Sequence, residues 1–240
     1  MKALLTDENK VILFKGKDVH TKWGYIKKED IENSAPGNIL ETNTGKKVYL
    51  ISAGFKDLYN KIKRQAQIIL PKDVAAIIAN CGINKRSRVL DAGGGSGGFS
   101  CLVASLVKKV YTYEIREDHA RICRQNSEML NLKNIKIKEK DVYEGIDERK
   151  LDLIVLDLSE PWKALNNSHK ALSSGGWLVN YSPNLTQVKK LVEELEKNDQ
   201  FLYIKTIELI EREWEVKGQQ TRPKYKMLGH TGFLTFARRV

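Results

Sequence analysis

A cluster of glycines follows a short apolar segment, and this junction limits what the rest of the chain can fold into. Residues 88–98 read Arg-Val-Leu-Asp-Ala-Gly-Gly-Gly-Ser-Gly-Gly. Val89 and Leu90 favour a strand, whereas the glycines have no β-carbon, so they can adopt positive φ angles and let a ligand approach the main chain. Apolar residues at helical spacing continue over residues 98–107. A strand, a glycine turn and a helix in this order form the nucleotide-binding corner of a doubly wound α/β fold.

Two classes of nucleotide fit the glycine spacing. Gly93, Gly95 and Gly98 match a dinucleotide fingerprint, whereas Gly93, Gly95 and Gly97 match the version that binds S-adenosylmethionine (SAM). The glycines alone leave both ligands open, so the choice depends on the residues that end the neighbouring strands.

The composition is that of a globular protein, and its excess of basic residues fits either a nucleic-acid partner, which we favour, or a Lys-rich surface selected for stability. Its 240 residues, 41% of them apolar, suit one sizeable α/β domain and a smaller one. No apolar run is long enough to span a membrane and no secretory leader is visible, so we expect a cytoplasmic protein. Cys81, Cys101 and Cys123 form no metal-binding pattern, which predicts buried free thiols. The net charge of +11 and the pI of about 9.4 favour a polyanionic partner.

Residues 1–58 differ from the rest and predict a small β-rich N-terminal domain. Apolar runs at residues 10–14 and 47–51 are separated by Gly, Asn and Asp, and Gly45 fits a hairpin turn. The basic and aromatic side chains of this region fit either a nucleic-acid contact or a solvated strand face, and the sequence favours neither. These side chains are Lys15, Lys17, Trp23, Tyr25, Lys27 and Lys28.

Residues 59–240 predict an α/β domain in which strands and helices alternate. The predicted strands cover residues 87–92, 110–115, 135–139, 151–158, 177–181, 201–210 and 232–237. The predicted helices cover residues 71–79, 98–107, 118–130, 163–172 and 186–197. The run Leu-Asp-Leu-Ile-Val-Leu-Asp-Leu at 151–158 is typical of a central parallel strand buried on both faces. A polar segment, 211–231, separates the last two strands, which we expect to pair antiparallel.

Acidic residues stand at the ends of successive predicted strands, where a doubly wound sheet binds its ligand. Glu114 ends the second strand, and an acid there can bind the two ribose hydroxyls of an adenosine. Asp91 lies beside the glycine turn, Asp141 can meet an adenine amino group, and Asp157 is expected to face a methyl acceptor. This layout favours SAM over NAD. It predicts a Rossmann-like class I SAM-dependent methyltransferase with a mostly parallel seven-stranded sheet.

Several longer segments resemble the TrmI type of bacterial and archaeal tRNA (adenine-N1)-methyltransferases, which modify an adenine of the tRNA T-loop. The resemblance covers nearly the whole chain and is strongest from Gln65 onward. The chain departs from the family pattern at Ser159, where the family usually has Pro, and at Asp91 and Gly94, where it more often has Glu and Thr. The matching segments are Gln67-Ile-Ile-Leu-Pro-Lys-Asp73, Asp91 to Gly97, Tyr113-Glu-Ile-Arg-Glu117, Leu156-Asp-Leu-Ser-Glu-Pro-Trp162, Tyr181-Ser-Pro-Asn-Leu-Thr-Gln187, Arg212-Glu-Trp-Glu-Val216, Arg222-Pro223 and Gly229-His-Thr-Gly-Phe233.

This resemblance implies an activity, a partner and an assembly. The expected reaction is transfer of a methyl group from SAM to N1 of an adenine at position 58 of tRNA, with position 57 left open as a second target. The resemblance also implies a homotetramer with a small N-terminal β domain. The residues that it implies for SAM binding, together with the strand-end acids, are Gln67, Asp91, Gly93, Gly95, Ser96, Gly97, Glu114, Asp141, Val142 and Asp157.

Asp157 and Tyr181 are the predicted catalytic residues. Adenine N1 is a poor nucleophile, so transfer depends mainly on holding N1 in line with the methyl group. The N6 amino group becomes more acidic as N1 gains a positive charge, so a carboxylate beside N6 can accept its proton. Asp157 suits this role, and Tyr181, with Pro183 and Asn184, is expected to line the pocket that receives the extruded nucleotide.

Other residues and functions remain open. Trp162, after Pro161, is expected under the acceptor loop or in the core, and His230 suits a structural hydrogen bond better than a catalytic base. Lys72 and Arg222 fit either phosphate contacts or structural roles. The alternative function is a SAM-dependent methyltransferase of a small molecule, such as a corrinoid precursor, and the net charge counts against it. A non-catalytic RNA-binding protein is a third reading, against which the intact glycine turn and acids argue.

Overall fold

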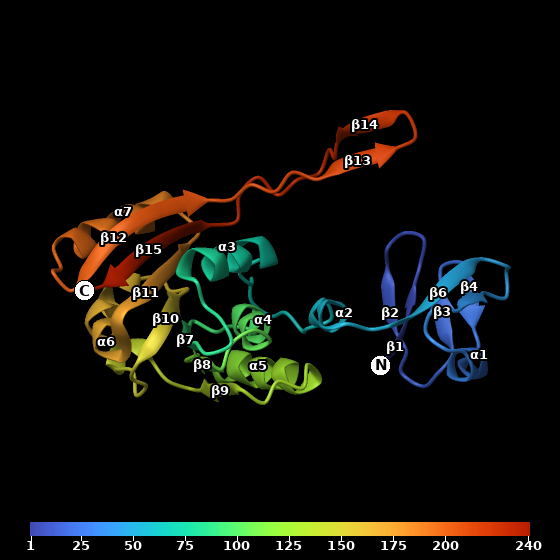
Figure 1. Ribbon diagram of the computed structural model, residues 1–240, viewed down its shortest axis with the longest axis horizontal. Coiled ribbons are helices and arrows are strands. Elements are labelled where there is room, and N and C mark those ends of the chain that lie inside the picture. The colour runs from blue at the N-terminus through green and yellow to red at the C-terminus, as the bar shows by residue number, and fades with distance from the viewer. The chain divides into compact units, whose positions relative to one another are not determined.

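The computed structural model describes all 240 residues, and the chain divides into two compact units, Met1–Ile62 and Lys63–Val240 (Figure 1). Each unit has a hydrophobic core of its own. None of the helices combines the length and apolar character that a membrane span requires.

The N-terminal unit is built from short antiparallel strands around one small core. Four strands pair in the order β2 (Val11–Leu13), β1 (Lys2–Leu5), β6 (Lys47–Ser52) and β5 (Ile39–Glu41). A separate hairpin and two short helices complete the unit: β3 (Val19–Thr21), β4 (Gly24–Ile26), α1 (Lys28–Asn33) and α2 (Phe55–Tyr59). The core side chains are Leu4, Val19, Ile26, Ile31, Val48 and Leu50.

The β-rich character predicted for this region is confirmed, although neither of its two short helices was predicted from the sequence. Gly45 lies in the turn between β5 and β6 with a φ of +79°, a conformation that favours glycine. Helix α1 reads Lys-Glu-Asp-Ile-Glu-Asn and buries Ile31 alone. It therefore has no apolar periodicity from which a helix could be predicted.

The second unit is organised by a seven-stranded sheet in the order β12-β15-β11-β10-β7-β8-β9. Strands β11, β10, β7, β8 and β9 are parallel, and β15 lies antiparallel between β11 and β12. The predicted class I methyltransferase sheet, with its terminal antiparallel pair, is confirmed. The strands are β7 (Arg88–Ala92), β8 (Lys109–Tyr113), β9 (Ile135–Lys138), β10 (Leu151–Leu156), β11 (Leu172–Ser182), β12 (Phe201–Glu208) and β15 (Phe233–Arg239).

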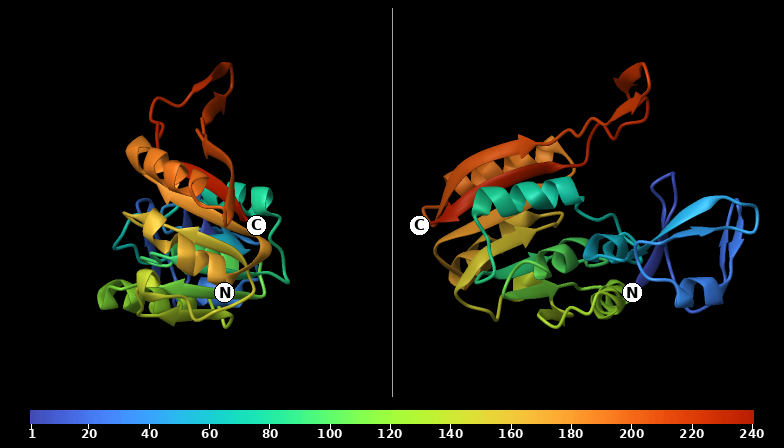
Figure 2. Two further views of the ribbon diagram at one scale, coloured as in Figure 1. Left: turned by 90° about the vertical axis from the view of Figure 1, so that its left-hand side faces the viewer. Right: turned by 45° about the vertical axis from the view of Figure 1, so that its right-hand side comes forward.

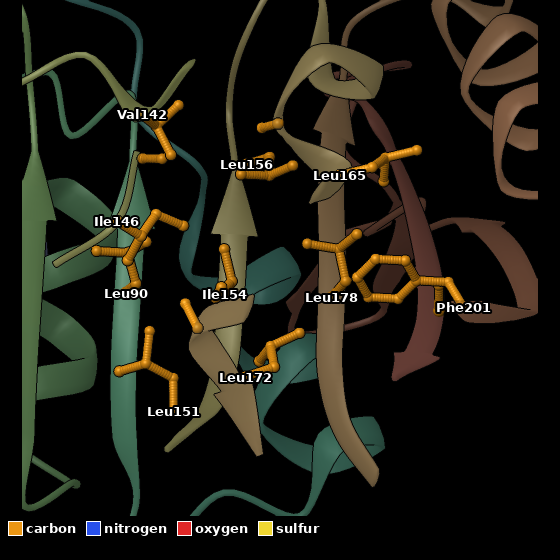
Figure 3. Packing of buried hydrophobic residues seen from close by; sticks show 14 of the residues in the cluster. Leu90, Val142, Ile146, Leu151, Ile154, Leu156, Leu165, Leu172, Leu178 and Phe201 are labelled. Carbon is orange, nitrogen blue, oxygen red and sulfur yellow. The ribbon is translucent and has the colours of Figure 1, made fainter. Parts of the chain in front are cut away.

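Helices cover both faces of this sheet, because the side chains of successive strand residues point to opposite sides. One face packs Leu90, Ile154 and Leu178 against Leu165 and neighbouring residues (Figure 3). The other face joins strand residues such as Val89 and Val155 to α3 and α4. The helices are α3 (Pro71–Cys81), α4 (Gly98–Ala104), α5 (Glu117–Met129), α6 (Leu165–Ala171) and α7 (Leu185–Glu196), with 3₁₀ turns at Val142–Glu144 and Pro161–Ala164.

Two features of this unit go beyond the sequence prediction. Strand β11 begins at Leu172 and not at Trp177, and its register with β10 shifts between Leu151 and Leu153. The segment predicted as a polar spacer contains a hairpin, β13 (Trp214–Lys217) with β14 (Gln220–Pro223). We refer to residues 209–231 as the arm; it extends away from the sheet in both views of Figure 2.

The three cysteines are free thiols. Cys101 and Cys123 are buried, as the sequence predicts, whereas Cys81 is partly exposed. Cys101 belongs to α4 and Cys123 to α5, and both sulfur atoms lie beside Gly97, which leads into α4.

Candidate active site

The glycine turn after β7 is held between two neighbouring strands. The backbone N–H groups of Gly93 and Gly94 both donate to the carbonyl oxygen of Tyr113, at 3.0 and 3.1 Å. A β-carbon on Gly94 would lie 2.1 Å from the Thr112 methyl group. A β-carbon on Gly97, whose φ is +79°, would lie 2.6 Å from the Cys123 sulfur. Side chains at Gly94 and Gly97 are thus excluded because the turn packs closely against β8 and α5.

A cavity of about 380 Å³ opens over this turn, at the carboxyl ends of the parallel strands. A doubly wound sheet binds its ligand at this edge. Most of the predicted cofactor residues line the cavity, namely Gln67, Gly93, Gly95, Glu114, Asp141, Val142 and Asp157. The others do not: Asp91, Ser96 and Gly97 lie outside the lining, and so does Tyr181.

Glu114 follows β8 and is buried at the cavity wall. One carboxylate oxygen accepts the Gly95 N–H at 2.7 Å, and the other accepts the Arg116 N–H at 2.9 Å. These bonds fix the carboxylate and fasten the glycine turn to β8. A carboxylate oxygen can accept more than one hydrogen bond, so Glu114 keeps capacity for hydroxyl groups of a bound ligand.

Asp141 and Val142 form a second wall after β9. The Asp141 carboxylate accepts the Tyr143 N–H at 2.8 Å and so begins the 3₁₀ turn at this point. Asn167, from α6, donates its side-chain amide to the carbonyl oxygens of Val142 at 3.0 Å and Tyr143 at 2.9 Å. The turn is therefore fixed from both sides, and Asp141 faces the cavity.

Asp157 directly follows β10 and lines the same cavity. Its main-chain N–H donates to the Ala92 carbonyl at 2.9 Å, which holds it beside the glycine turn. Burial, followed by the negative charges of Asp91 and Glu114, raises the pKa of Asp157 to about 7. No hydrogen bond from the protein stabilises its charged form. Asp157 is thus a carboxylate that can accept a proton near neutral pH.

Asp91 stands behind the turn and not in the cavity. Because side chains of a strand alternate between faces, its carboxylate points toward α4 and accepts the Ser100 hydroxyl at 2.5 Å. Burial raises the pKa of Asp91 to about 7. The prediction that Asp91 touches the cofactor is not supported by this placement, and its observed role is to anchor the start of α4.

Ser96 also acts from outside the cavity. Its hydroxyl oxygen accepts the N–H groups of Gln65 at 2.9 Å and Ala66 at 3.3 Å. Asn126, from α5, donates to the Ser96 carbonyl at 2.8 Å. Ser96 therefore fastens the segment that carries Gln67 across the mouth of the glycine turn.

Tyr181 is placed differently from the prediction. Its ring is buried under Gly232, and its hydroxyl donates to the Thr231 carbonyl oxygen at 2.6 Å. Burial, with the charges of Asp73 and Asp157, raises the pKa of Tyr181 to about 12. A buried phenol bonded to a main-chain carbonyl does not line the cavity, so the structure gives Tyr181 a supporting role.

The residues whose roles the sequence did not decide, Lys72, Arg222 and Trp162, all have contacts within the protein. Lys72, 14% exposed, donates to Asp73, to the Leu209 carbonyl and to Thr231, which makes it a structural residue at the base of the arm. Arg222 pairs with Glu215 across the β13–β14 hairpin. Trp162 packs against the core, with the Lys190 ammonium 4.0 Å from its ring centre.

Sequence reasoning missed several residues of the cavity wall. Tyr113, His119, Lys140 and Tyr143 line it, together with Ala66, Ile115, Leu158 and Ser159. Tyr113 and Lys140 directly precede the predicted acids Glu114 and Asp141, so the sequence places them near the cavity. It does not show that their side chains face the cavity, because the direction of a side chain beyond a strand end depends on loop geometry. His119 reaches the wall from the first turn of α5, with Nδ1 3.9 Å from Glu114.

The site fits an adenosine-containing ligand such as SAM. Gly93 and Gly95 line the cavity with backbone alone, and Gly93 also packs directly against the end of β10, where a β-carbon would lie 2.2 Å from the Asp157 carbonyl oxygen. Glu114 offers carboxylate oxygens for hydroxyl groups, and Asp141 offers them for an amino group. Val142, Leu158 and Tyr113 supply apolar wall between these acids.

Comparison with known proteins identifies relatives over nearly the whole chain. Residues 48–222 match the family described as "tRNA methyltransferase complex GCD14 subunit". The tRNA (adenine(57)-N(1)/adenine(58)-N(1))-methyltransferase TrmI of Methanocaldococcus jannaschii is 36% identical, over 99% of this chain and 94% of the relative.

Two crystal structures share the fold of both units. A SAM-dependent O-methyltransferase from Thermotoga maritima has a TM-score of 0.90 and 30% identity, covering 100% of this chain and 92% of that one. The tRNA (m1A58) methyltransferase TrmI from Aquifex aeolicus has a TM-score of 0.86 and 26% identity, covering 100% and 96%. The similarity therefore includes the N-terminal unit as well as the methyltransferase sheet.

Proposed function

The chain belongs to the family of tRNA (adenine-N1)-methyltransferases that includes TrmI, and on this premise we propose that it methylates N1 of adenine 58 in the T-loop of tRNA, with SAM as the methyl donor. The resemblance drawn from the sequence is thereby confirmed. The observation that carries the proposed chemistry is Asp157, a carboxylate without hydrogen-bonded partners that borders the cavity beside the glycine turn.

Different residues of the cavity would bind different parts of SAM. Glu114 would hold the ribose hydroxyls and Asp141 the adenine amino group of SAM, while Gly93 and Gly95 leave room for its chain. When bound, SAM supplies a methyl group activated on a positively charged sulfur. Gln67 lines the same cavity on the segment that Ser96 holds in place.

Asp157 would act on the acceptor base. As N1 gains a positive charge, the N6 amino group becomes acidic, and an ionised carboxylate beside it stabilises the charge and accepts the proton. The charge of Asp157 costs least once a cation occupies the cavity, because a nearby positive charge lowers the pKa of a carboxyl. The chain thus keeps Asp157 protonated or ionised according to the occupant of the cavity.

The net charge of +11 supports an RNA substrate over a small molecule. A folded tRNA must release its target nucleotide from the T-loop before N1 can enter a cavity of this size. A homotetramer and a cytoplasmic location remain part of this proposal. Exposed apolar residues on the arm, Trp214 and Val216 among them, support an assembly of several copies.

The function is tested by incubating the protein with labelled SAM and an unmodified tRNA transcript, followed by nucleoside analysis. We expect 1-methyladenosine, and its loss when adenine 58 of the transcript is replaced by guanosine. Label remaining after that replacement would locate a second target, and replacement of adenine 57 then identifies it. Absence of 1-methyladenosine, or label in another nucleoside, would refute the proposal.

A further inference from the structure

His230 joins three segments of the chain at the base of the arm. Its Nδ1 lies 2.6 Å from a carboxylate oxygen of Glu208, the last residue of β12. Its Nε2 lies 2.8 Å from the carbonyl oxygen of Pro183, in the turn between β11 and α7. The ring also packs against Phe233, with ring centres 5.0 Å apart. One imidazole thus connects the outgoing end of the arm, its returning end and the β11–α7 turn.

The two partners of His230 can only accept hydrogen bonds. A carboxylate and a main-chain carbonyl carry no hydrogen to donate, so each bond requires a hydrogen on the imidazole. A neutral imidazole has one N–H, whereas the imidazolium ion has two. Both bonds can therefore exist together only when His230 is doubly protonated.

The surroundings of His230 favour the protonated form. Its hydrogen bond with Glu208 raises the pKa of His230 above its usual value, the Pro183 carbonyl acts in the same direction, and the charge of Lys72 on α3 opposes them. Lys72 is itself paired with Asp73, which limits its effect. The pKa of His230 is raised in the folded protein. Both hydrogen bonds, to Glu208 and to the Pro183 carbonyl, are therefore present below about pH 6.5, and one of them is lost as the pH rises through the raised pKa.

A second, buried set of bonds holds the same part of the arm without a titrating histidine. Lys72 donates to the Leu209 carbonyl and to the Thr231 hydroxyl, and that hydroxyl donates to Asp73 at 2.9 Å. These inner hydrogen bonds keep the arm attached at any moderate pH. We refer to the two hydrogen bonds of His230, to Glu208 and to the Pro183 carbonyl, as the outer layer, and only this layer depends on the protonation of His230.

The β11–α7 turn lies at the same edge of the sheet as Asp157, and we refer to this edge as the rim of the site. Strands β10 and β11 are parallel neighbours, so Asp157 and the turn at Pro183 follow their carboxyl ends at the same edge of the sheet. Asn184 caps α7 in this turn through the Gln187 N–H. Fixing Pro183 therefore fixes the position of this rim relative to the arm.

We propose that doubly protonated His230 is a positioning residue that fastens the arm to the β11–α7 turn and so shapes the surface on which tRNA docks. It does not touch the reacting atoms. This inference rests on the proposed function, because it assigns the turn to the tRNA side of the site. It predicts that the affinity for tRNA, and not the rate of the chemical step, depends on the protonation of His230.

Two variants, one of His230 and one of its partner Glu208, should change the pH dependence of tRNA affinity in opposite ways. His230→Phe keeps an aromatic ring against Phe233 but removes both donors, so the outer layer is absent at every pH. Glu208→Gln replaces the carboxylate with an amide that can donate to Nδ1, so a neutral His230 keeps both bonds. His169→Phe is the matched control, because His169 lies on α6 with an edge-on contact to Phe201.

The experiment measures kcat and KM for unmodified tRNA between pH 6 and 9, with SAM affinity and thermal unfolding as checks of folding. For the wild type and His169→Phe, we expect the KM for tRNA to rise about three- to ten-fold with pH, as for loss of one hydrogen bond. His230→Phe should show the high KM throughout, and Glu208→Gln the low KM throughout. The kcat of all four proteins should follow one pH profile, because Asp157 is unchanged.

The outcomes separate this inference from the function on which it rests. If the wild type forms no 1-methyladenosine, the proposed function fails and the role of His230 fails with it. If the wild type methylates tRNA but Glu208→Gln behaves like His230→Phe, or all four proteins share one KM profile, only the role of His230 is overturned. A His230→Phe effect confined to kcat would likewise overturn it.

Discussion

The carbonyl oxygen of Asp157 occupies the space in which a β-carbon on Gly93 would lie, at 2.2 Å from its ideal position. The glycine turn that we propose to bind the cofactor and the strand end that carries the proposed catalytic carboxylate are thus in direct main-chain contact. Asp157 is further fixed by the bond from its N–H to the Ala92 carbonyl, 2.9 Å long. In the proposed mechanism, cofactor binding and acceptor positioning therefore depend on the same segment of backbone.

Gly93→Ala should therefore damage both functions. The methyl group would push Asp157 away and would impose a positive φ, here +87°, on a residue with a side chain. We expect a loss of about 2 kcal/mol or more in the free energy of unfolding and a large loss of SAM affinity. Gly82→Ala is the control, because Gly82 has a φ of +63° and open space around it. Calorimetry and thermal unfolding of the two variants should differ; equal behaviour would show that the contact with Asp157 has no consequence.

Asp157→Asn should slow the chemical step while leaving binding in place. The amide is nearly isosteric but cannot accept the N6 proton, so single-turnover methylation should fall by roughly two to four decades. In the wild type the rate should rise with pH and level off above a midpoint at or below about 7, since the ionised form is required. Asp199→Asn, an exposed carboxyl in the turn before β12, serves as control. A rate within a few-fold of wild type would exclude Asp157 as the proton acceptor.

The same substitution should stabilise the protein without ligands. Asp157 has a higher pKa in the folded state, about 7, than in the unfolded chain, about 3.9. Its contribution to stability is therefore fully present below about pH 4 and is lost as the pH rises through 7. At pH 8, Asp157→Asn should raise the free energy of unfolding by on the order of 2 kcal/mol, and the gain should shrink at pH 5. A variant less stable than wild type at pH 8 would contradict this account.

Glu114→Gln should weaken SAM binding about ten- to hundred-fold, the range expected for an impaired charged hydrogen-bond acceptor. The amide cannot accept from Gly95, Arg116 and the ribose hydroxyls together, because one of its two polar groups donates. Glu117→Gln is the control. It removes the same charge as Glu114→Gln, but Glu117 lies at the exposed start of α5 and does not line the cavity. Calorimetry should separate the two variants, and matching affinities would remove Glu114 from the ribose site.

Binding to tRNA should depend steeply on salt. A basic surface releases condensed counterions from RNA phosphates, so the affinity should drop about ten-fold or more between 50 and 200 mM salt. The expectation follows from the net charge of +11. A salt-independent affinity would mean that these charges do not contact the substrate.

The mostly parallel sheet and the acids at the ends of its strands could be predicted from the sequence, because the carboxyl ends of parallel strands meet at one edge. The apolar run 151–158 indicates a buried parallel strand, and parallel strands bring Glu114, Asp141 and Asp157 to one edge. The glycine turn could be predicted in the same way, from residues that only a close backbone approach requires.

Side-chain direction within these segments could not be predicted. Asp91 and Tyr181 both lie at strand ends, yet Asp91 points toward Ser100 and Tyr181 toward Thr231. Successive side chains of a strand point to opposite faces of the sheet. Whether a side chain near the strand end faces the cavity or the core therefore depends on where the strand ends and how the chain turns after it, which only the folded sheet shows. The hairpin β13–β14 escaped prediction for another reason: each strand has only four residues, and although Trp214 and Val216 alternate with polar residues in β13, β14 reads Gln-Thr-Arg-Pro and has no such alternation.

The position of β15 has a consequence for how the protein is made. Strand β15 lies between β11 and β12, although it is the last strand of the sheet in the sequence. On the ribosome, β12 therefore emerges with no neighbour to pair with, while β11 presents an open edge until residues 233–239 follow. Open edges of this kind invite pairing with other chains. The nascent protein therefore exposes an unpaired sheet edge until late in translation, after the strands that precede Glu114 and Asp157 have been synthesised.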